Sequence, residues 1–391
     1  AQEILCSSLL AQMSNPKRQR CDSGQDLQAE TGPSIVCLKY EDLTAGKDLT
    51  KDILQAYGPG GVGILYVSGV PGLAEARDAL LPLSRKLALL PPDVLSQYEF
   101  DPPVIGWSRG KEKFRGKPDF AKGSFYANPI YDDSAEGEDV GCVQVQPNVW
   151  PKEIPELRQA FKKMGELVYE VAKPIVKQVD KLVADSTPGK PPSNLFQRTF
   201  PESKLVVARL LHYYAVSEAE AVEEWCGWHN DNSTITGLVP AMWLDEETGS
   251  PVSAPSGAGL YVEGRDGDQV QVKAPKDCLG FQIGEAAQIL SGGAVHATPH
   301  MVRGHATPVG APKVCRETFA CFIEPHWDGV LEPPTGSEFE AIFKGREESK
   351  LIPPMRSRLQ KGDTFGKFLN RSFEHYYRHN NAVEDEPIEG A

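Results

Sequence analysis

The sequence has no long hydrophobic run, although the chain is 391 residues long. No apolar stretch approaches the roughly 18 residues that a membrane-spanning helix requires, so no membrane segment is expected. Basic residues are also outnumbered, because 41 Lys and Arg stand against 54 Asp and Glu and give a net charge of -13. An acidic surface gains nothing from nucleic acid or from an anionic membrane, so neither is expected as a partner.

Cysteine is sparse and unpatterned. The eight cysteines include no Cys-x-x-Cys pair, and their spacing predicts neither a zinc ribbon nor a disulfide framework. We therefore expect a reducing compartment and a cytoplasmic protein, with the basic residues at 17–20 leaving a nuclear location as the alternative. Cys315 and Cys321 are interpreted as ordinary buried thiols.

The chain is long enough to bury a sizeable core, which favours one large domain with appended parts. Residues 1–33 are polar and turn-rich, as is typical of a disordered tail. We expect an N-terminal α/β region over residues 34–200, a β core over 201–330 and a C-terminal helical extension over 331–391.

Hydrophobic periodicity predicts the elements of the N-terminal region. Strands are expected at 35–40 and 61–70, helices at 42–58, 73–90 and 152–185, and a loop rich in Gly, Lys and aromatic residues at 105–133. The helix at 152–185 is the clearest, because apolar residues recur every three or four positions around Phe161. Its apolar stripe is expected to pack against the outside of a sheet.

From Lys204 onward, short strands are separated by Gly, Pro or Asp. They are expected at 204–214, 233–244, 259–264, 269–274, 278–284, 286–292, 295–302 and 317–325. Such spacing favours an antiparallel barrel or jelly roll over βαβ units. The predicted fold is therefore mainly β with flanking helices, built on a double-stranded β-helix (jelly-roll) core, and residues 359–379 form a final helix.

His229 and Asp231 are the first candidate metal ligands. They are separated by one residue, so in an extended strand both side chains lie on one face. His300 is far enough along the chain to return on another strand. Two His and one carboxylate form the ligand set of non-haem Fe(II) oxygenases. His296 has the same strand parity as His300, so parity alone does not decide between them, and His305 falls in a predicted loop.

A second candidate group follows in Arg316 and Thr318. These residues share strand parity, so a guanidinium and a hydroxyl can face one ligand carboxylate. An Arg that points into a barrel without an anion would be a costly buried charge, which supports ligand binding. Glu317 points the other way and is expected on the solvent side.

Taken in order, these residues resemble the plant-type Fe(II)/2-oxoglutarate-dependent dioxygenases, which include isopenicillin N synthase-like oxidases. His229 and Asp231 match the family's His-x-Asp pair, and residues 280–300 match the segment that ends in the distal His. Residues 316–318 match its Arg-x-Ser/Thr motif, and Tyr214 in HYYA falls where the family has Asn-x-Tyr-Pro. A lone His-x-Asp pair would be a weak signal, whereas this ordered set is specific.

The resemblance implies that His229, Asp231 and His300 hold Fe(II) and form the catalytic centre. His300 is preferred over its rivals because it follows the Gln-Ile-Leu-Ser-Gly-Gly run at the family's offset. Arg316, Thr318 and Tyr214 would bind the distal carboxylate of 2-oxoglutarate, with ascorbate as an optional accessory. The implied reaction uses O₂ and couples decarboxylation of 2-oxoglutarate to hydroxylation, or desaturation, of a small organic substrate.

Two alternatives stay open. One is an isopenicillin N synthase-like iron oxidase that does not use 2-oxoglutarate, and the other is a non-catalytic barrel that binds a small molecule. A monomer is expected. The sequence does not identify the prime substrate, but residues in the predicted loop could bind an acidic metabolite: Lys113, Arg115, Lys117, Lys122 and Tyr126.

Overall fold

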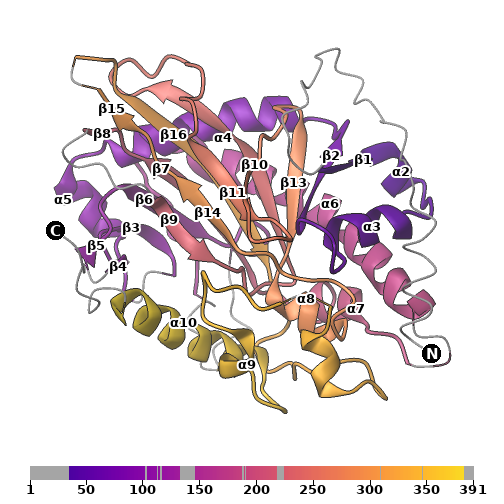
Figure 1. Cartoon of the computed structure of the whole chain (residues 1–391). Helices are drawn as coiled ribbons and strands as arrows, with labels where there is room; N and C mark the ends of the chain where they lie inside the picture. The colour runs from indigo at the N-terminus through magenta and orange to yellow at the C-terminus, as the bar shows by residue number, and fades with distance from the viewer. Residues whose placement is uncertain are drawn as a thin grey trace. The chain divides into compact units, whose positions relative to one another are not determined.

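Two facing β-sheets form the centre of the computed structural model (Figure 1). The larger sheet has the order β1-β2-β13-β10-β16-β7-β6-β3, and the smaller has the order β12-β11-β14-β9. The structure describes residues 35–101, 104–111, 113–114, 117–132, 146–186, 189, 191–217, 224–308, 310–345 and 347–382. The expected tail at residues 1–33 lies outside this description.

The strands of both sheets are short. In the larger sheet they are β1 (Val36–Lys39), β2 (Ile64–Ser68), β3 (Gly106–Arg109), β6 (Lys122–Ala127), β7 (Val206–Tyr213), β10 (Ile235–Asp245), β13 (Cys278–Ile283) and β16 (Val314–Ile323). In the smaller sheet they are β9 (Glu224–His229), β11 (Gly259–Glu263), β12 (Gln269–Gln271) and β14 (His300–Arg303). Neighbours pair antiparallel except β1 and β2, which are parallel. Two small pairs complete the described strands: β4 (Lys113–Phe114) with β5 (Lys117–Pro118), and β8 (Val216–Ser217) with β15 (Ala306–Thr307).

Helices surround the two sheets. They are α2 (Tyr40–Thr44), α3 (Thr50–Tyr57), α4 (Leu73–Ala88), α5 (Pro92–Leu95), α6 (Glu156–Ser186), α7 (Leu195–Thr199), α8 (Glu285–Leu290), α9 (Met355–Arg358) and α10 (Phe365–Ala382), with 3₁₀ turns at Ser96–Tyr98 and Phe339–Phe343. In the part of the chain that is described, no helix is both long and apolar enough to cross a membrane.

The larger sheet has two different faces, because side chains alternate along each strand. One face packs against α4 and α6, where the Phe161 and Phe319 rings meet edge to face at 5.0 Å between centroids. Helix α6 approaches β10 so closely that a Cβ on Gly237 would lie 2.1 Å from Val168 Cγ1. The opposite face looks toward the smaller sheet, and there Tyr213 and Trp243 cluster with residues such as Trp225 of β9. The candidate site is built from this inner face and from the facing strands β9 and β14.

Most expected elements are present, including the long helix with its buried apolar stripe. The expected helix at 42–58 is instead two helices, α2 and α3, because the chain turns through Gly46 at a φ of +68°. The expected loop at 105–133 was wrong, since β3 and β6 pair there and extend the sheet beyond β7. The inner face of β6 carries polar residues, so the sequence did not show the alternation of buried and exposed side chains that is typical of a strand.

The expected strand at 286–292 was also wrong. This segment forms α8, and all six residues of α8 are buried. A short apolar run of this kind has no polar face, so periodicity cannot distinguish a buried strand from a buried helix.

Candidate active site

Strand pairing brings the three candidate metal ligands together. His300 of β14 lies opposite His229 of β9, and Asp231 follows β9 by two residues. The two imidazole centroids are 4.3 Å apart. Asp231 Oδ1 lies 3.8 Å from His229 Nε2 and 3.6 Å from His300 Nε2. One ligand atom from each residue fits within 4.8 Å of the others, which is close enough for a single metal ion.

Main-chain carbonyl groups fix how the two imidazoles face Asp231. Nδ1 of His229 lies 2.8 Å from Gly227 O, and Nδ1 of His300 lies 3.2 Å from Thr298 O. Each Nδ1–H can donate to its carbonyl oxygen, which leaves the Nε2 lone pair directed at the carboxylate. Among the described residues, Asp231 Oδ2 is buried and has no hydrogen-bond partner. A buried carboxylate oxygen without a partner fits a metal ligand.

The two histidines have opposite pKa shifts. Burial and the neighbouring His229 lower the pKa of His300 to about 4. Burial also opposes charge on His229, but Cys226 and Asp231 outweigh it and raise its pKa to about 9. In the metal-free protein, Cys226 and then Asp231 therefore favour a proton on His229. A bound metal ion would replace that proton, because metal-ligating imidazoles are neutral.

The rival histidines lie elsewhere. His296 is buried and its main-chain N–H donates to Tyr57 O at 2.8 Å. Neither His296 nor His305 belongs to a ligand group found among the described residues.

Arg316 is a buried cation on the inner face of β16. Its side chain is enclosed by aromatic rings, with the guanidinium carbon 5.0 Å from the Tyr213 ring centroid and 6.0 Å from that of Trp243. The residue is only 7% exposed, and within the described chain its Nε and Nη1 have no hydrogen-bond partner. Buried donors without partners are costly, so the arrangement suits an anionic ligand.

Thr318 lies on the same face as Arg316, two residues further along. Its hydroxyl donates to Val239 O at 3.1 Å, next to the irregular register where β10 pairs with β16. The Thr318 proton is therefore already engaged with the main chain.

Tyr214 is not brought to Arg316. Its hydroxyl donates to Ala88 O at the end of α4, and its ring packs edge to face on His212 at 4.3 Å. Tyr213, the preceding residue, lies opposite Arg316 in the pairing of β7 with β16. Tyr213 was not predicted from the sequence. Strand parity places it opposite Arg316 only once the pairing of β7 with β16 is known.

Glu317 was expected on the solvent side, and this expectation was wrong. The residue is completely buried, and its Oε1 is 2.8 Å from Nδ1 of His212 on β7. The reason is that α4 covers this part of the outer face, where it packs on β7 and β16.

The residues expected to bind an acidic metabolite give little support to that role. Lys122 is buried and forms an ion pair with Asp119. Arg115 lies outside the described residues, as do the side chains of Lys113 and Lys117.

A buried polar network supports the metal-ligand loop, and the sequence reading missed it. The Asn230 N–H donates to the Tyr376 hydroxyl of α10 at 3.0 Å, and its side-chain amide donates to Glu285 Oε1 at 3.0 Å. Glu285 also donates its main-chain N–H to Asp231 O at 2.8 Å. Arg358 closes the network with two bonds to the Glu285 carboxylate, of 2.6 and 2.8 Å. No local sequence signal connects these distant residues.

Known proteins resemble this chain in sequence over half of its length and in fold over most of it. No family model matches the chain. The chain is 26% identical over 201 residues to jasmonate-induced oxygenase 4 of Arabidopsis thaliana, an alignment that covers 51% of this chain and 50% of the relative. The chain thus spans about half the length of the curated relative that it matches.

Solved structures match more of the chain. A full-length Neurospora crassa protein in complex with alpha-KG has a TM-score of 0.61 and 19% identity, covering 87% of this chain and 96% of that one. JOX2 in complex with 2OG, Fe and JA has a TM-score of 0.56 and 17% identity, covering 88% and 89%. At these identities the likeness shows a shared fold, so the predicted fold class is confirmed.

Proposed function

We propose that this chain, as a member of the 2-oxoglutarate/Fe(II) oxygenase family, hydroxylates or desaturates a small organic substrate while 2-oxoglutarate and O₂ are consumed. In the hydroxylation, one oxygen atom enters the substrate and the other enters succinate, with release of CO₂. The observation that carries the proposal is the convergence of His229, Asp231 and His300 within 4.8 Å. We expect the protein to act as a monomer.

The donor set fits Fe(II). Two imidazole nitrogens and one carboxylate oxygen on one side of a metal ion leave its remaining positions open to a keto acid and O₂. Fe(II) bound there would supply the redox chemistry that activates O₂ and decarboxylates 2-oxoglutarate. The protein's part is to hold His229, Asp231 and His300 in a fixed orientation, which the Nδ1 contacts to Gly227 O and Thr298 O provide.

Arg316 is the proposed anchor for the distal carboxylate of 2-oxoglutarate. Its unpartnered N–H groups can donate to both carboxylate oxygens, and the Tyr213 and Trp243 rings shield that ion pair from water. Thr318 would assist only after its hydroxyl turns from Val239 O and donates to the ligand instead. In this arrangement Tyr213, rather than Tyr214, is the tyrosine beside the distal carboxylate of 2-oxoglutarate.

A reducing, cytoplasmic location fits the described cysteines Cys226, Cys315 and Cys321, which are free thiols. The Neurospora crassa structure with alpha-KG and the JOX2 structure with 2OG support the same co-substrate here. Ascorbate enters the proposal only as a reductant that keeps iron in the Fe(II) state.

The test is succinate release from 2-oxoglutarate in the presence of Fe(II), O₂ and ascorbate, screened against a pool of small metabolites. We expect succinate release by the wild type and none above background by His229→Ala or Asp231→Ala, because both lose the metal. Arg316→Ala should retain the metal and raise the KM for 2-oxoglutarate by about 10- to 100-fold, the effect of losing a charged hydrogen bond.

Two outcomes would contradict the proposal. Metal-loaded wild type that releases no more succinate than Asp231→Ala would rule out 2-oxoglutarate as co-substrate. O₂ consumption without succinate would instead indicate the isopenicillin N synthase-like oxidase.

A further inference from the structure

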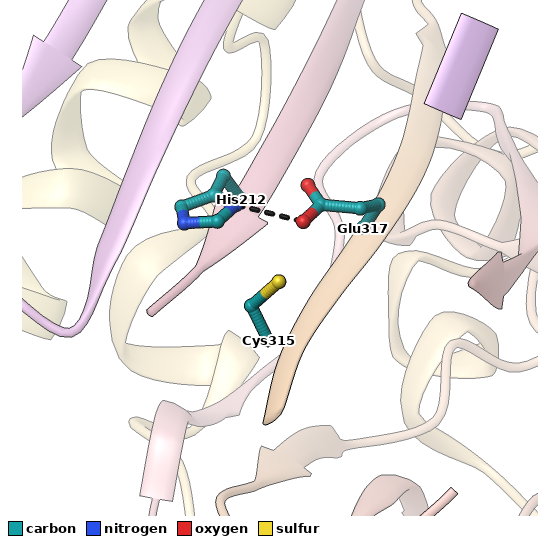
Figure 2. A group of neighbouring side chains, drawn as sticks. All are labelled: His212, Cys315 and Glu317. Atoms are coloured by element: carbon teal, nitrogen blue, oxygen red, sulfur yellow. Dashed lines mark hydrogen bonds and ion pairs between the residues drawn. The ribbon is translucent and has the colours of Figure 1, made fainter. Parts of the chain in front are cut away.

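A second group of metal-ligating side chains lies on the opposite face of the larger sheet. Figure 2 shows His212 of β7 beside Cys315 and Glu317 of β16. Glu317 is paired with His212 in the strand register, and Cys315 lies two residues earlier on the same face. All three side chains are 0% exposed, and one ligand atom from each lies within 4.8 Å of the others.

The group has polar atoms that the described chain leaves unsatisfied. His212 Nδ1 and Glu317 Oε1 are 2.8 Å apart, but His212 Nε2 and Glu317 Oε2 are buried without a hydrogen-bond partner among the described residues. Glu246, at the start of the loop after β10, has its Oε1 3.9 Å from His212 Nε2. Glu246 is partly exposed, and its Oε1 also accepts the Ala215 N–H at 2.8 Å. The completely buried Glu317 carboxylate does need positive charge nearby, because an uncompensated buried carboxylate is strongly destabilising.

Among the described residues, no Lys or Arg forms an ion pair with Glu317 or Glu246, whose ion-pair partner is His212. Arg85 of α4 approaches this region, but its guanidinium donates to the main-chain oxygens of Glu246 and Glu247, at distances between 2.5 and 2.9 Å. Its hydrogen bonds therefore do not neutralise the carboxylates directly. Burial and the adjacent Glu317 raise the pKa of the Cys315 thiol, so the thiol stays neutral in the metal-free protein.

The mixture of donors selects the cation. A thiolate, an imidazole and a carboxylate are the ligands of four-coordinate Zn²⁺, whereas Mg²⁺ and Ca²⁺ prefer oxygen alone. Zn²⁺ also lowers the pKa of a thiol that coordinates it, so binding would displace the Cys315 proton to solvent.

We propose that His212, Cys315 and Glu317, with Glu246 in the fourth position, form a Zn²⁺ site that is separate from the iron centre. The zinc ligands lie on the outer face of the larger sheet, whereas His229 and His300 lie on the smaller sheet that faces its inner side, toward which Arg316 points. The bound ion would join β7, β16 and the end of β10. Its role is structural, because all four positions come from the protein and none is left open for a substrate.

The test uses the full-length protein, stripped of metal and titrated with Co²⁺ under reducing conditions. Co²⁺ bound by a thiolate gives a near-ultraviolet charge-transfer band, which ligands of the His-Asp-His type do not give. We expect the wild type to bind two equivalents and to show the band. Cys315→Ser should lose the band and one equivalent, whereas Asp231→Ala should lose the other equivalent and keep the band.

Two cysteine variants serve as controls. Cys321 is buried on the same face of β16, roughly 20 Å further along at about 3.3 Å per residue, so Cys321→Ser should keep both equivalents and the band. Cys226 Sγ lies 3.9 Å from His229 Nδ1, and Cys226→Ser should also keep the band. Loss of the band in Cys226→Ser, or its survival in Cys315→Ser, would assign the thiolate to another place and overturn the proposal.

Glu317→Gln provides a second variant in case Cys315→Ser does not fold. Circular dichroism checks its fold, and Zn²⁺ content is measured after equilibration with excess Zn²⁺ and removal of the free ion. We expect one equivalent fewer than in the wild type. A folded Glu317→Gln with unchanged Zn²⁺ content, or a wild type that binds only one equivalent, would show that the group is a metal-free imidazole–carboxylate pair.

Discussion

Tyr213 is the last residue of β7 and Tyr214 is the residue after it. The two side chains have different surroundings because a strand directs successive side chains to opposite faces. Tyr213 faces the Arg316 guanidinium, and Tyr214 binds Ala88 O behind the sheet. The pair in HYYA therefore contains one residue positioned to shape the carboxylate site and one that fixes α4 to the sheet.

This difference gives a matched pair of variants. Tyr213→Leu should weaken the binding of 2-oxoglutarate to Mn²⁺-loaded protein about 2- to 30-fold, because a buried cation–π contact contributes about 0.5–2 kcal/mol. Tyr214→Leu should leave the affinity unchanged while lowering stability. Anaerobic calorimetry measures both affinities. If Tyr214→Leu lost more affinity for 2-oxoglutarate than Tyr213→Leu, Tyr214 would be assigned to the co-substrate site instead.

Asp132 is a residue whose charge stabilises the fold away from the site. Burial disfavours its carboxylate, but Arg158, Asn148 and Lys162 outweigh burial and lower its pKa to about 2. The Arg158 guanidinium lies 2.6 Å from Oδ2. Because the pKa is lower in the folded state, the stabilisation is complete above the unfolded value of about 4 and disappears as the pH falls toward 2.

We therefore expect Asp132→Asn to lose about 1–2 kcal/mol of unfolding free energy at pH 7, a value reduced for partial exposure of the pair. The difference from wild type should shrink between pH 4 and pH 2, as measured by urea unfolding across that range. Asp93→Asn, at an exposed position, should change stability by less than about 0.5 kcal/mol throughout. If Asp132→Asn were still less stable than the wild type at pH 2, the charge of Asp132 would not be the cause of the lost unfolding free energy.

At the scale of elements, α8, α9 and α10 form one support for the segment that carries His229 and Asp231. Glu285 of α8 and Arg358 of α9 are both completely buried and joined by two hydrogen bonds. Removing one partner of a buried pair leaves the other charge without compensation.

Arg358→Met should therefore lower the unfolding free energy by about 3–5 kcal/mol and weaken Mn²⁺ binding. Glu285→Gln combined with Arg358→Met should recover much of that stability, because no buried charge remains. The matched control is Arg356→Met, which breaks the exposed Arg356–Glu340 pair and should cost less than about 1 kcal/mol. Equal losses in the single and double variants would contradict this account.

The elements also show what the sequence could predict. The α6 stripe around Phe161 was predictable because one helical face is apolar and the other polar. The α8 segment was not, because Gln288 is buried together with the apolar residues around it, so Ala286 to Leu290 has no exposed face. His229, Asp231 and His300 were predicted as metal ligands from their spacing and their resemblance to a family, and the structure brings them within 4.8 Å of one another. The Glu285–Arg358 pair was not found, because two distant charged residues contain no signal of their partnership.

At the scale of the whole molecule, the larger sheet combines strands from distant parts of the chain, from β1 near residue 36 to β16 near residue 323. A ligand held on its inner face therefore contacts strands on which most of the fold depends. Anything that binds only the folded state stabilises the whole chain by mass action.

We expect Mn²⁺ and 2-oxoglutarate together to raise the Tm by about 3 °C beyond Mn²⁺ alone. At 100 times the Kd, the ligand contributes about 2.7 kcal/mol, and the Tm shift per kcal/mol falls as chains become larger. Arg316→Ala should keep the Mn²⁺ effect and lose the 2-oxoglutarate effect in a thermal scan. An equal 2-oxoglutarate shift in Arg316→Ala would remove Arg316 from the co-substrate site.

The bond from Asn230 to the Tyr376 hydroxyl has a consequence for biosynthesis. A ribosome makes His229, Asp231 and His300 well before it makes Tyr376, so a nascent chain holds every candidate metal ligand before the hydroxyl that accepts the Asn230 N–H exists. We therefore expect the site to reach its final geometry only after α10 has left the exit tunnel and docked.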